Sequence, residues 1–428
     1  MKPAARIQAA IELMAEIYHS TAPADAIVHG YMRQRRYIGA GDRREISELV
    51  YGVMRTYWLL EGILHHFWAS PSDDAIQKAR RHILIYLHKF KPEFSVVDLF
   101  SGEEYAPKRL TPTEQDLLGQ VKEFNCEDLS EAAQLSCPDW VYNLLKANNP
   151  HNYRAILLSL QVTAPLDLRV NILKSGREKA LAKLRREGYS CEPTLLSPWG
   201  IRLQERQPLK HHPLLQEGVL EIQDEGSQLI AMVCAVEPGM AVWDYCAGAG
   251  GKTLALAAMM QNKGRILATD TVAWRLKNAP QRLRRAGVHN VETRVLDEQA
   301  GKWVKRQAGK FDCVLVDAPC SGSGTWRRNP ELRWRMDATG FQELLQKQQE
   351  ILDKAALLVK PGGRLVYATC SLLNPENREQ IEMFLKKHPQ FAFYSLSYDY
   401  ANNGALELNP ADHQTDGFFA AVLQKSDS

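Results

Sequence analysis

The sequence has no pair of cysteines in a C-x-x-C arrangement, and its eight cysteines are scattered along 428 residues. This spacing argues against a disulfide framework and against a structural zinc site. No apolar stretch approaches the roughly 18–20 residues needed to span a bilayer. The first residues, MKPAARIQAAIELMAEI, mix charged and apolar side chains, so we expect no signal peptide. These absences predict a cytoplasmic protein with reduced thiols, no metal and no membrane partner.

The sequence also lacks a strong charge of either sign. Its formal net charge is +3, which indicates no class of partner, so local clusters of arginine are more informative than the total. Because 428 residues exceed what one hydrophobic core usually organises, we expect two or three domains.

Apolar periodicity predicts three domains. Residues 1–136 repeat apolar side chains at helical spacing, with one helix expected to begin at Asp42 and a loop-rich segment over 89–122. Residues 137–221 mix strand-like runs with a helical run, which predicts a small α/β connector. Residues 222–428 alternate strands with helices, which predicts an α/β domain whose mostly parallel sheet is covered on both faces. The predicted strands of this domain are Ala241–Tyr245, Arg265–Thr269, Val291–Val295, Cys313–Val316 and Arg364–Thr369.

A glycine-rich loop, DYCAGAGGKT, follows the first of these strands and begins at Asp244. A phosphate-binding loop would need its first glycine at Cys246, and the dinucleotide pattern G-x-G-x-x-G would need its third at Thr253, so neither pattern is present. In an open α/β sheet such a loop lies where ligands bind, beyond the carboxyl ends of the strands. Gly248 and Gly250 would let a ligand approach the backbone closely.

The second strand ends in Asp270, about 20 residues after Gly250, at the separation typical of a carboxylate that binds ribose hydroxyls. A ribose contact without a phosphate loop favours a nucleoside-like cofactor such as S-adenosylmethionine. Its carboxylate would meet the amides of Gly250, Gly251 and Lys252 at the start of the next helix. Asp297, after the third strand, would lie near the adenine. The alternative is a tight turn that only caps a helix.

Two cysteines follow the fourth and fifth strands, in VDAPCSGSG and YATCSLLNPEN. Because both strands end at the same edge of the sheet, we expect Cys320 and Cys370 on the side where the cofactor binds. A cytosolic cysteine is more often a small buried hydrophobe, which is our interpretation of Cys234 and Cys313. Two converging thiols instead favour nucleophilic chemistry, in which a thiolate adds to carbon 6 of a pyrimidine and activates carbon 5 toward a methyl donor.

The segments DYCAGAGGKT, LVDAPCSGSGTWRRNPELRW and YATCSLLNPEN resemble the three signature segments of the Sun/Nop RNA cytosine-5 methyltransferases. The resemblance runs from about residue 137 to the ending TDGFFAAVLQK, and DRREISELVYGVMRTYWLLEGIL resembles a NusB-like helical domain found in that family. It implies a class I (Rossmann-like) methyltransferase domain, S-adenosylmethionine as methyl donor, and formation of 5-methylcytosine in RNA, with rRNA as the expected substrate.

By this resemblance, Cys370 is the nucleophile, Cys320 assists release of the methylated base, and Asp317 holds the cytosine and borders the cofactor. At Gly248 and Ala249 the loop departs from the family's usual Ala-Ala-Pro-Gly-Gly-Lys, which adds flexibility but leaves the amides available. The residues implied to bind S-adenosylmethionine are Cys246, Ala247, Gly248, Ala249, Gly250, Gly251, Lys252, Asp270, Asp297 and Asp317.

Arginine alternates with tryptophan directly after Cys320, in GTWRRNPELRWRMD. Arginine suits phosphates and aromatic faces suit unstacked bases, so this pattern favours contacts with single-stranded RNA. The alternative is a solvated arginine face with half-buried tryptophans. The residues predicted to bind RNA are Trp326, Arg327, Arg328 and Arg333.

Three other functions stay open at this point. An RNA-binding or ribosome assembly factor with an inactive methyltransferase domain is favoured only by the loop departure at Gly248 and Ala249. A DNA cytosine-5 methyltransferase would use Cys320 alone as its nucleophile and leave Cys370 a bystander. A tRNA substrate is also compatible with the sequence, which gives no oligomeric state.

Overall fold

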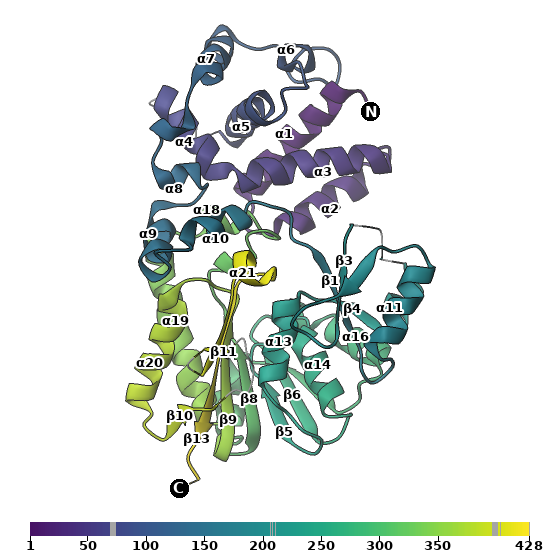
Figure 1. Cartoon of the computed structure of the whole chain (residues 1–428), viewed down its shortest axis with the longest axis vertical. Coiled ribbons are helices and arrows are strands. Elements are labelled where there is room, and N and C mark those ends of the chain that lie inside the picture. Colours follow the sequence, from purple (N-terminus) through teal and green to yellow (C-terminus); the bar gives the residue numbers. More distant parts are fainter. Residues whose placement is uncertain are drawn as a thin grey trace. The chain divides into compact units, whose positions relative to one another are not determined.

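The computed structural model describes residues 1–68, 74–205, 207, 209, 211–395, 401–402 and 404–427. The chain divides into two compact units, each drawn in Figure 1. Unit 1 contains Met1–Thr163 and Thr325–Asp337, and unit 2 contains Ala164–Gly324 and Ala338–Ser428. This division differs from the three predicted domains, because the first boundary lies after Thr163 and because the segment 325–337 belongs to unit 1.

Unit 1 is built from helices around one core, which includes Leu13, Met14 and Ile17 of the first helix. This helix presents apolar residues at i, i+3 and i+4, as its periodicity predicted. The helices of unit 1 are α1 (Pro3–His19), α2 (Ala24–Gln34), α3 (Ala40–Arg55), α4 (Tyr57–Phe67), α5 (Ala75–Phe90), α6 (Val96–Leu99), α7 (Pro112–Glu123), α8 (Glu131–Gln134), α9 (Asp139–Asn148), α10 (Tyr153–Ser159) and α18 (Leu332–Arg335).

Two predictions for unit 1 are wrong. Asp42 is not the N-cap of α3; Gly39 holds that position, and Asp42 lies in the first turn, where it accepts a hydrogen bond from the Met1 amino group at 2.9 Å. The segment 89–122 is not loop-rich throughout, because it contains α6 and most of α7. A capping box between Thr111 and Glu114 begins α7, and this local signal was available in the sequence.

Unit 2 contains two sheets. The smaller sheet has the order β2-β3-β1-β4 with antiparallel pairing, and Leu181 and Leu184 of a helix pack against its core. The α/β connector was predicted over this part of the chain, at residues 137–221. Its elements are β1 (Leu166–Val170), α11 (Arg177–Arg186), β2 (Cys191–Pro193), β3 (Gly200–Leu203), α12 (Pro213–Gln216) and β4 (Leu220–Ile222).

The larger sheet has the order β11-β12-β13-β9-β8-β5-β6-β7, and β10 pairs with β13. All five predicted strands are present, and β7, β6, β5, β8 and β9 run parallel. The strands are β5 (Ala241–Asp244), β6 (Arg265–Asp270), β7 (Val291–Val295), β8 (Phe311–Asp317), β9 (Val359–Thr369), β10 (Phe391–Phe393), β11 (Ala401–Asn402), β12 (Ala405–Leu408) and β13 (Phe418–Lys425).

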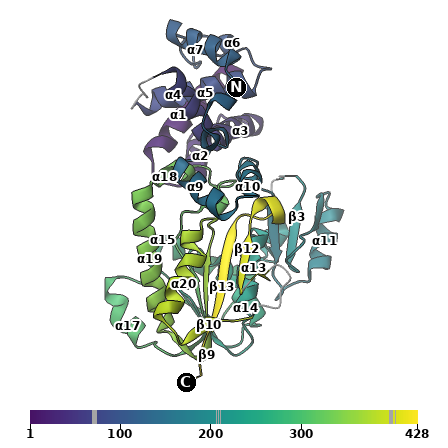
Figure 2. The ribbon, with the colours of Figure 1, turned by 60° about the vertical axis from the view of Figure 1, so that its left-hand side comes forward.

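Helices cover both faces of this sheet, as predicted. The helices of this part are α13 (Glu225–Val233), α14 (Gly251–Met259), α15 (Ala273–Leu276), α16 (Ala279–Ala286), α17 (Gly301–Lys305), α19 (Ala338–Ala356), α20 (Arg378–Lys387) and α21 (Pro410–His413). Figure 2 shows α13 and α14 on one side of the sheet and α19 and α20 on the other, and two separate apolar cores fill these layers. The strand order reverses between β5 and β8, which places a ligand crevice at their carboxyl ends.

The antiparallel edge was not predicted. β13 pairs with β9 from Phe419 opposite Thr369 to Gln424 opposite Arg364, and β12 pairs with the other side of β13. The run FFAAVLQK is buried on both faces until its last two residues, so it lacks the alternation that would have marked a strand.

Candidate active site

The glycine-rich loop joins the end of β5 to the start of α14. Gly248 and Gly250 have left-handed φ angles of 54° and 79°, which residues with a Cβ rarely adopt. The Gly248 N–H donates to Asp270 Oδ2 at 3.0 Å, and the Val272 N–H donates to Asp270 Oδ1 at 2.8 Å. Asp270 is only 4% exposed. The carboxylate predicted to meet a ribose therefore also closes the loop onto the end of β6.

The start of α14 offers amides toward the crevice. Gly251 and Lys252 lie in its first turn, where backbone N–H groups have no acceptor within the helix. The Gly250 amide differs from the prediction, because it donates within the loop to Ala247 O at 2.9 Å. A Cβ placed at Gly248 would meet no atom within 4 Å, so the space above the loop is open.

Two arginine side chains donate hydrogen bonds to backbone carbonyls of the loop. Arg282 of α16 donates from Nη1 to Ala249 O at 2.7 Å, and Arg169 of β1 donates from Nη1 to Gly251 O at 2.7 Å. Burial lowers the pKa of Arg169 to about 10. Glu221 of β4 pairs with Arg282 at 2.9 Å and with Arg285 at 2.6 Å. The loop that lacks the family's proline is thus held by two guanidinium groups, and no local sequence pattern predicts these contacts.

Asp244, the last residue of β5, is completely buried. The Thr253 hydroxyl donates to its Oδ2 at 2.6 Å, whereas its Oδ1 has no hydrogen-bond partner among the described residues. Burial raises the pKa of Asp244 to about 7, and the neighbouring charges of Asp317 and Asp270 act in the same direction. This side chain was not among the predicted site residues.

Lys252 and Asp317 form an ion pair with 2.6 Å between Nζ and Oδ2. Burial acts to lower the pKa of Lys252, but the Asp317 carboxylate outweighs it and the pKa is raised. Lys252 is therefore a fixed positive charge, and Cys370 is among the groups that interact with it electrostatically. A cation in this position stabilises a thiolate.

The two predicted cysteines meet at one point. The Sγ atoms of Cys320, after β8, and Cys370, after β9, lie 3.3 Å apart. The hydrogen bond with Cys370 and burial together raise the pKa of the Cys320 thiol well above its usual range. The Cys320 thiol is therefore protonated at neutral pH, and it can donate a hydrogen bond to the sulfur of Cys370.

A buried carboxylate lies behind this pair. Glu376 accepts a hydrogen bond from Ser321 N at 2.8 Å and another from Ser321 Oγ at 2.5 Å, and it also accepts one from the Ser371 hydroxyl. These serines directly follow Cys320 and Cys370. Glu376 was not among the predicted site residues, although it lies in the segment YATCSLLNPEN after β9.

The remaining residues singled out in the sequence make fewer contacts at the site. Asp297 is exposed and caps a short 3-10 turn by accepting from Gln299 N at 3.1 Å. Burial raises the pKa of the Cys246 thiol, so Cys246 lines the loop as a neutral group. Cys234 and Cys313 are fully buried, as expected of small hydrophobes.

The predicted RNA-binding segment needs correction. Trp326, Arg327 and Arg333 are 2%, 4% and 1% exposed, and they belong to unit 1. Arg333 donates to Ser136 O at 2.6 Å and to Leu160 O at 2.8 Å. These side chains therefore close the helical unit from within and do not form an RNA-binding surface. Arg328 is partly exposed, so its contact with RNA stays a prediction.

The same local pattern explains the error. Trp334 stacks on Tyr57 with 4.5 Å between ring centroids, and Arg335 donates to the carbonyls of Ser20 and Ala22 at 3.2 and 2.7 Å. Alternating arginine and tryptophan is the composition of a nucleic-acid surface, but it is also that of a segment that caps helix ends through guanidinium–carbonyl bonds.

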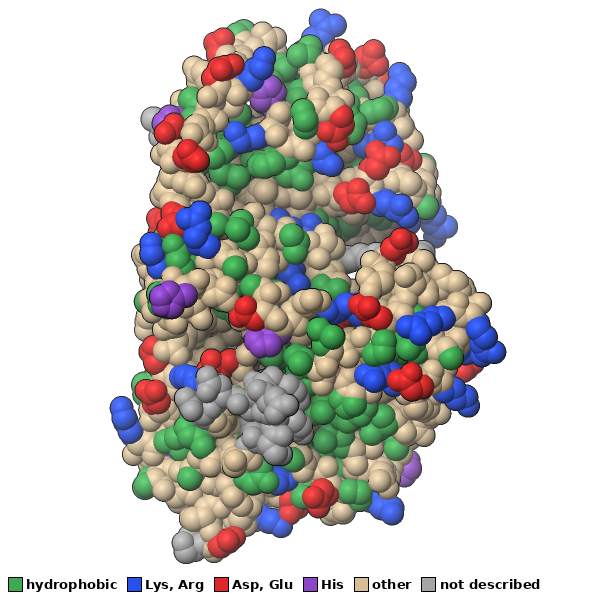
Figure 3. Space-filling model, in the orientation of Figure 1, with side chains coloured by type: hydrophobic (Ala, Val, Ile, Leu, Met, Phe, Trp, Pro, Cys, Tyr) green, Lys and Arg blue, Asp and Glu red, His purple; other side chains and the backbone are tan. Residues whose placement is uncertain are grey.

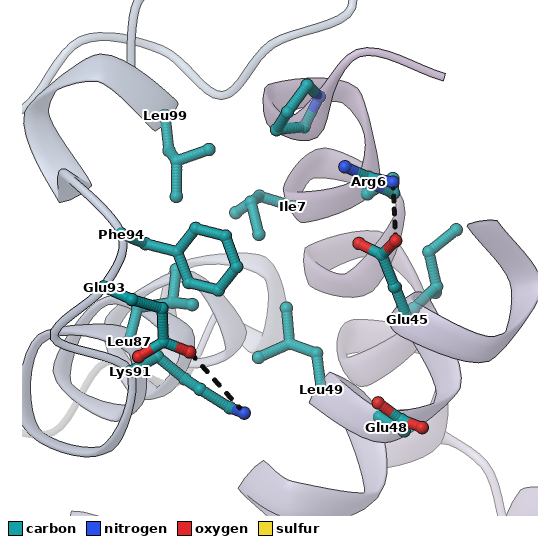
Figure 4. Close-up of a pocket in the computed structure, with 12 residues that line it drawn as sticks. Arg6, Ile7, Glu45, Glu48, Leu49, Leu87, Lys91, Glu93, Phe94 and Leu99 are labelled. Carbon is teal, nitrogen blue, oxygen red and sulfur yellow. Dashed lines mark hydrogen bonds and ion pairs between the residues drawn. The ribbon is translucent and has the colours of Figure 1, made fainter. Parts of the chain in front are cut away.

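A separate pocket of about 200 Å³ lies in unit 1 between α1, α3, α5 and α6. Figure 4 shows Ile7, Leu49 and Phe94 along its wall, with the ion pairs Arg6–Glu45 and Lys91–Glu93 at its rim. Glu48 also lines this pocket, and the described residues of its lining include no Cys, Ser, Thr, Tyr or His.

On the face drawn in Figure 3, the described residues form no large patch of one charge sign. On the face seen in Figure 3, basic and acidic side chains are interspersed. In the described part of the chain, three or more His, Cys, Asp or Glu side chains do not converge as a metal ion would require. None of the helices formed by the described residues is long and apolar enough to cross a membrane.

Comparisons with known proteins agree with the predicted resemblance. The family described as "16S rRNA methyltransferase RsmB/F" matches residues 231–424, and the family described as "Methyltr_RsmF/B-like, ferredoxin-like domain" matches residues 137–210. Probable ribosomal RNA small subunit methyltransferase B of Synechocystis sp. is 30% identical over 420 residues, which cover 92% of this chain and 93% of that protein. The corresponding methyltransferase B of Citrobacter koseri is 30% identical over 397 residues, covering 90% and 91%.

Two solved structures are similar to this chain, one of them over nearly its whole length. The crystal structure of PH0851 matches with a TM-score of 0.82 and 27% identity over 99% of both chains. A methyltransferase homolog protein from Pyrococcus horikoshii matches with a TM-score of 0.61 and 27% identity, covering 74% of this chain and 100% of that one. The expectation of a Rossmann-like methyltransferase fold with an N-terminal helical region is confirmed.

Proposed function

This chain belongs to the family of 16S rRNA methyltransferases RsmB/F, and we propose that it transfers a methyl group from S-adenosylmethionine to carbon 5 of a cytosine in RNA, with rRNA as the substrate. The observation that carries this proposal is the 3.3 Å separation of the Cys320 and Cys370 sulfurs at the end of two parallel strands. One thiol suffices for addition to a pyrimidine, so a second thiol in contact with it favours a reaction with a separate release step.

The residues of the loop fit S-adenosylmethionine. Open space above Gly248, the free amides of the first turn of α14 and the unpartnered Oδ1 of Asp244 offer a surface, donors and an acceptor for its methionine part. Asp270 keeps further lone pairs for ribose hydroxyls, and Asp297 is exposed on the adjacent strand end. When bound, the cofactor supplies an electrophilic methyl group.

Different residues of the chain carry out the successive steps of the reaction. The Cys370 thiolate, stabilised by Lys252 and by the Cys320 thiol, forms a bond to carbon 6 of the cytosine, and the electron pair of the 5,6 double bond becomes available at carbon 5. Asp317 holds the base at its polar edge. After carbon 5 is methylated, its proton passes to solvent water, the bond between carbon 6 and Cys370 breaks with its electron pair on the sulfur, and the double bond is restored. Cys320 assists this step.

A covalent trap tests the reaction. Cys320→Ala protein is incubated with S-adenosylmethionine and total cellular RNA and then run on a denaturing gel. A protein–RNA adduct that is absent with Cys370→Ala supports the assignment, and sequencing the trapped RNA identifies the substrate as rRNA, tRNA or neither. If wild type methylates RNA while Cys320→Ala forms no adduct, the roles of the two cysteines are wrong.

The same variants separate the rival functions. A DNA-type enzyme keeps activity with Cys370→Ala and forms no adduct with Cys320→Ala. The proposed enzyme instead loses all activity with Cys370→Ala and is trapped as an adduct with Cys320→Ala. An assembly factor with an inactive domain binds no S-adenosylmethionine by calorimetry and methylates no RNA.

A further inference from the structure

The two loops that carry the cysteines leave the sheet before the cysteines are reached. The parallel register of β8 and β9 ends with Asp317 opposite Ala368. Cys320 and Cys370 therefore lie beyond the last paired residues, where strand pairing no longer fixes their separation. Contacts outside the sheet must hold the two sulfurs together.

Glu376 supplies such contacts to both loops at once. Its Oε1 accepts from Ser321 N at 2.8 Å, and its Oε2 accepts from the hydroxyl groups of Ser321 and Ser371. Gln348 of α19 completes the set, because its Nε2 donates to Glu376 Oε1 at 3.0 Å and to Pro319 O at 2.9 Å. The residue before Cys320 and the residue after each cysteine are thus tied to one carboxylate.

The side chains of this hydrogen-bond network are buried. Glu376 has no solvent exposure, and Ser371 and Gln348 are 1% and 0% exposed. A buried carboxylate without hydrogen bonds is strongly unfavourable, so its four donors must stay in place for the fold to be stable. The carboxylate accepts at both oxygens and can receive all four bonds, whereas an amide accepts at one oxygen only.

We propose that Glu376 is a positioning residue that holds the Cys320 and Cys370 sulfurs in contact by accepting hydrogen bonds from the residue that follows each cysteine. The functional meaning of this role rests on the proposed two-cysteine reaction, but the geometric role does not. Glu376 does not touch the reacting atoms, and it acts only through the serines.

A dithiol reagent tests the geometry without RNA or cofactor. Phenylarsine oxide forms two As–S bonds with a pair of neighbouring thiols and releases water, so it reports whether two sulfurs converge. On the full chain, we expect Cys320 and Cys370 to be protected from iodoacetamide by this reagent in peptide mass spectra. Glu376→Ala should weaken that protection about tenfold, as the loss of charge-assisted hydrogen bonds implies. Glu379→Ala, an exposed carboxylate of α20, is the matched control and should behave as wild type.

The outcomes are distinct. Unchanged protection in Glu376→Ala, or no protection in wild type, overturns the proposal. If circular dichroism shows that Glu376→Ala is unfolded, the double variant Ser321→Ala, Ser371→Ala is measured instead. Protection of the two cysteines as strong as in wild type would then overturn the proposal. In methylation assays we expect Glu376→Gln to lower kcat about tenfold with KM for RNA and the affinity for S-adenosylmethionine unchanged. Glu376-dependent protection in a protein that methylates no RNA would refute the proposed function and leave the positioning role intact.

Discussion

Lys252 Nζ lies 2.6 Å from Asp317 Oδ2, and this ion pair joins the first turn of α14 to the end of β8. The lysine comes from the loop expected to hold the cofactor, and the carboxylate comes from the strand that leads to Cys320. The side chains are 12% and 31% exposed, so the pair is partly shielded from water and its attraction is stronger than at an open surface. One cation therefore fixes the carboxylate expected to hold the base and also provides positive charge to Cys370.

Replacing Lys252 should impair catalysis more than folding. In Lys252→Met, Asp317 loses its cation and the Cys370 thiolate loses a stabilising charge, so we expect kcat to fall about 100-fold, as for loss of one electrostatic contact in an active site. Steady-state methylation of RNA gives the value, with the exposed Lys263→Met as control. Activity within twofold of wild type would contradict the assigned role of Lys252.

Asp244 should make stability depend on pH. Its pKa in the folded protein is about 7, above its usual value, so the folded state holds a proton that the unfolded state releases. The stability of wild type relative to Asp244→Asn should therefore fall as pH rises from about 4 through about 7, by up to about 4 kcal/mol. Urea unfolding of both proteins across this range measures the difference. A constant difference would show that Asp244 is ionised in the folded state throughout.

The parallel half of the fold could be predicted from the sequence because most of its strands contain a short apolar run followed by a turn or a polar residue, whereas β7 (VETRV) alternates. β7 has the predicted bounds, and β8 and β9 end side by side, so the loops that carry Cys320 and Cys370 begin at the same edge of the sheet. β13 and its antiparallel pairing could not be predicted in the same way, because its buried run has no period that separates strand from helix.

The contacts that support the site were harder to predict than the site itself. Arg169 and Glu376 contact residues that lie 82 and 55 positions away in the chain, and no local pattern signals such pairs. The segment after Cys320 was predicted wrongly for a different reason. Its arginines and tryptophans are compatible both with an RNA-binding surface and with packing inside the helical unit. Only the packing of Trp326 and Arg333 inside unit 1 distinguishes a structural segment from an RNA surface.

Arg282 should control cofactor affinity through the loop. In Arg282→Ala the Ala249 carbonyl loses its donor, and a loop with glycine at 248 and no proline at 249 gains freedom that binding must then remove. We expect the dissociation constant for S-adenosylmethionine to rise about tenfold in calorimetry, the scale of one charge-assisted hydrogen bond. Arg284→Ala, exposed on the same helix, should bind as wild type does. Equal affinities in both variants would show that the loop is rigid without this bond.

Arg333 should affect stability and not RNA affinity directly. Its guanidinium is buried and donates to Ser136 O and Leu160 O, so Arg333→Ala leaves two carbonyls without donors and an empty space beside Trp326. We expect a loss of about 3 kcal/mol in the unfolding free energy of unit 1, the usual cost of removing one member of a buried polar contact. Chemical unfolding followed by tryptophan fluorescence measures this loss, with the exposed Arg36→Ala of the same unit as control. If Arg333→Ala instead unfolds like wild type but binds RNA more weakly at low salt only, the side chain reaches phosphates and its structural assignment is wrong.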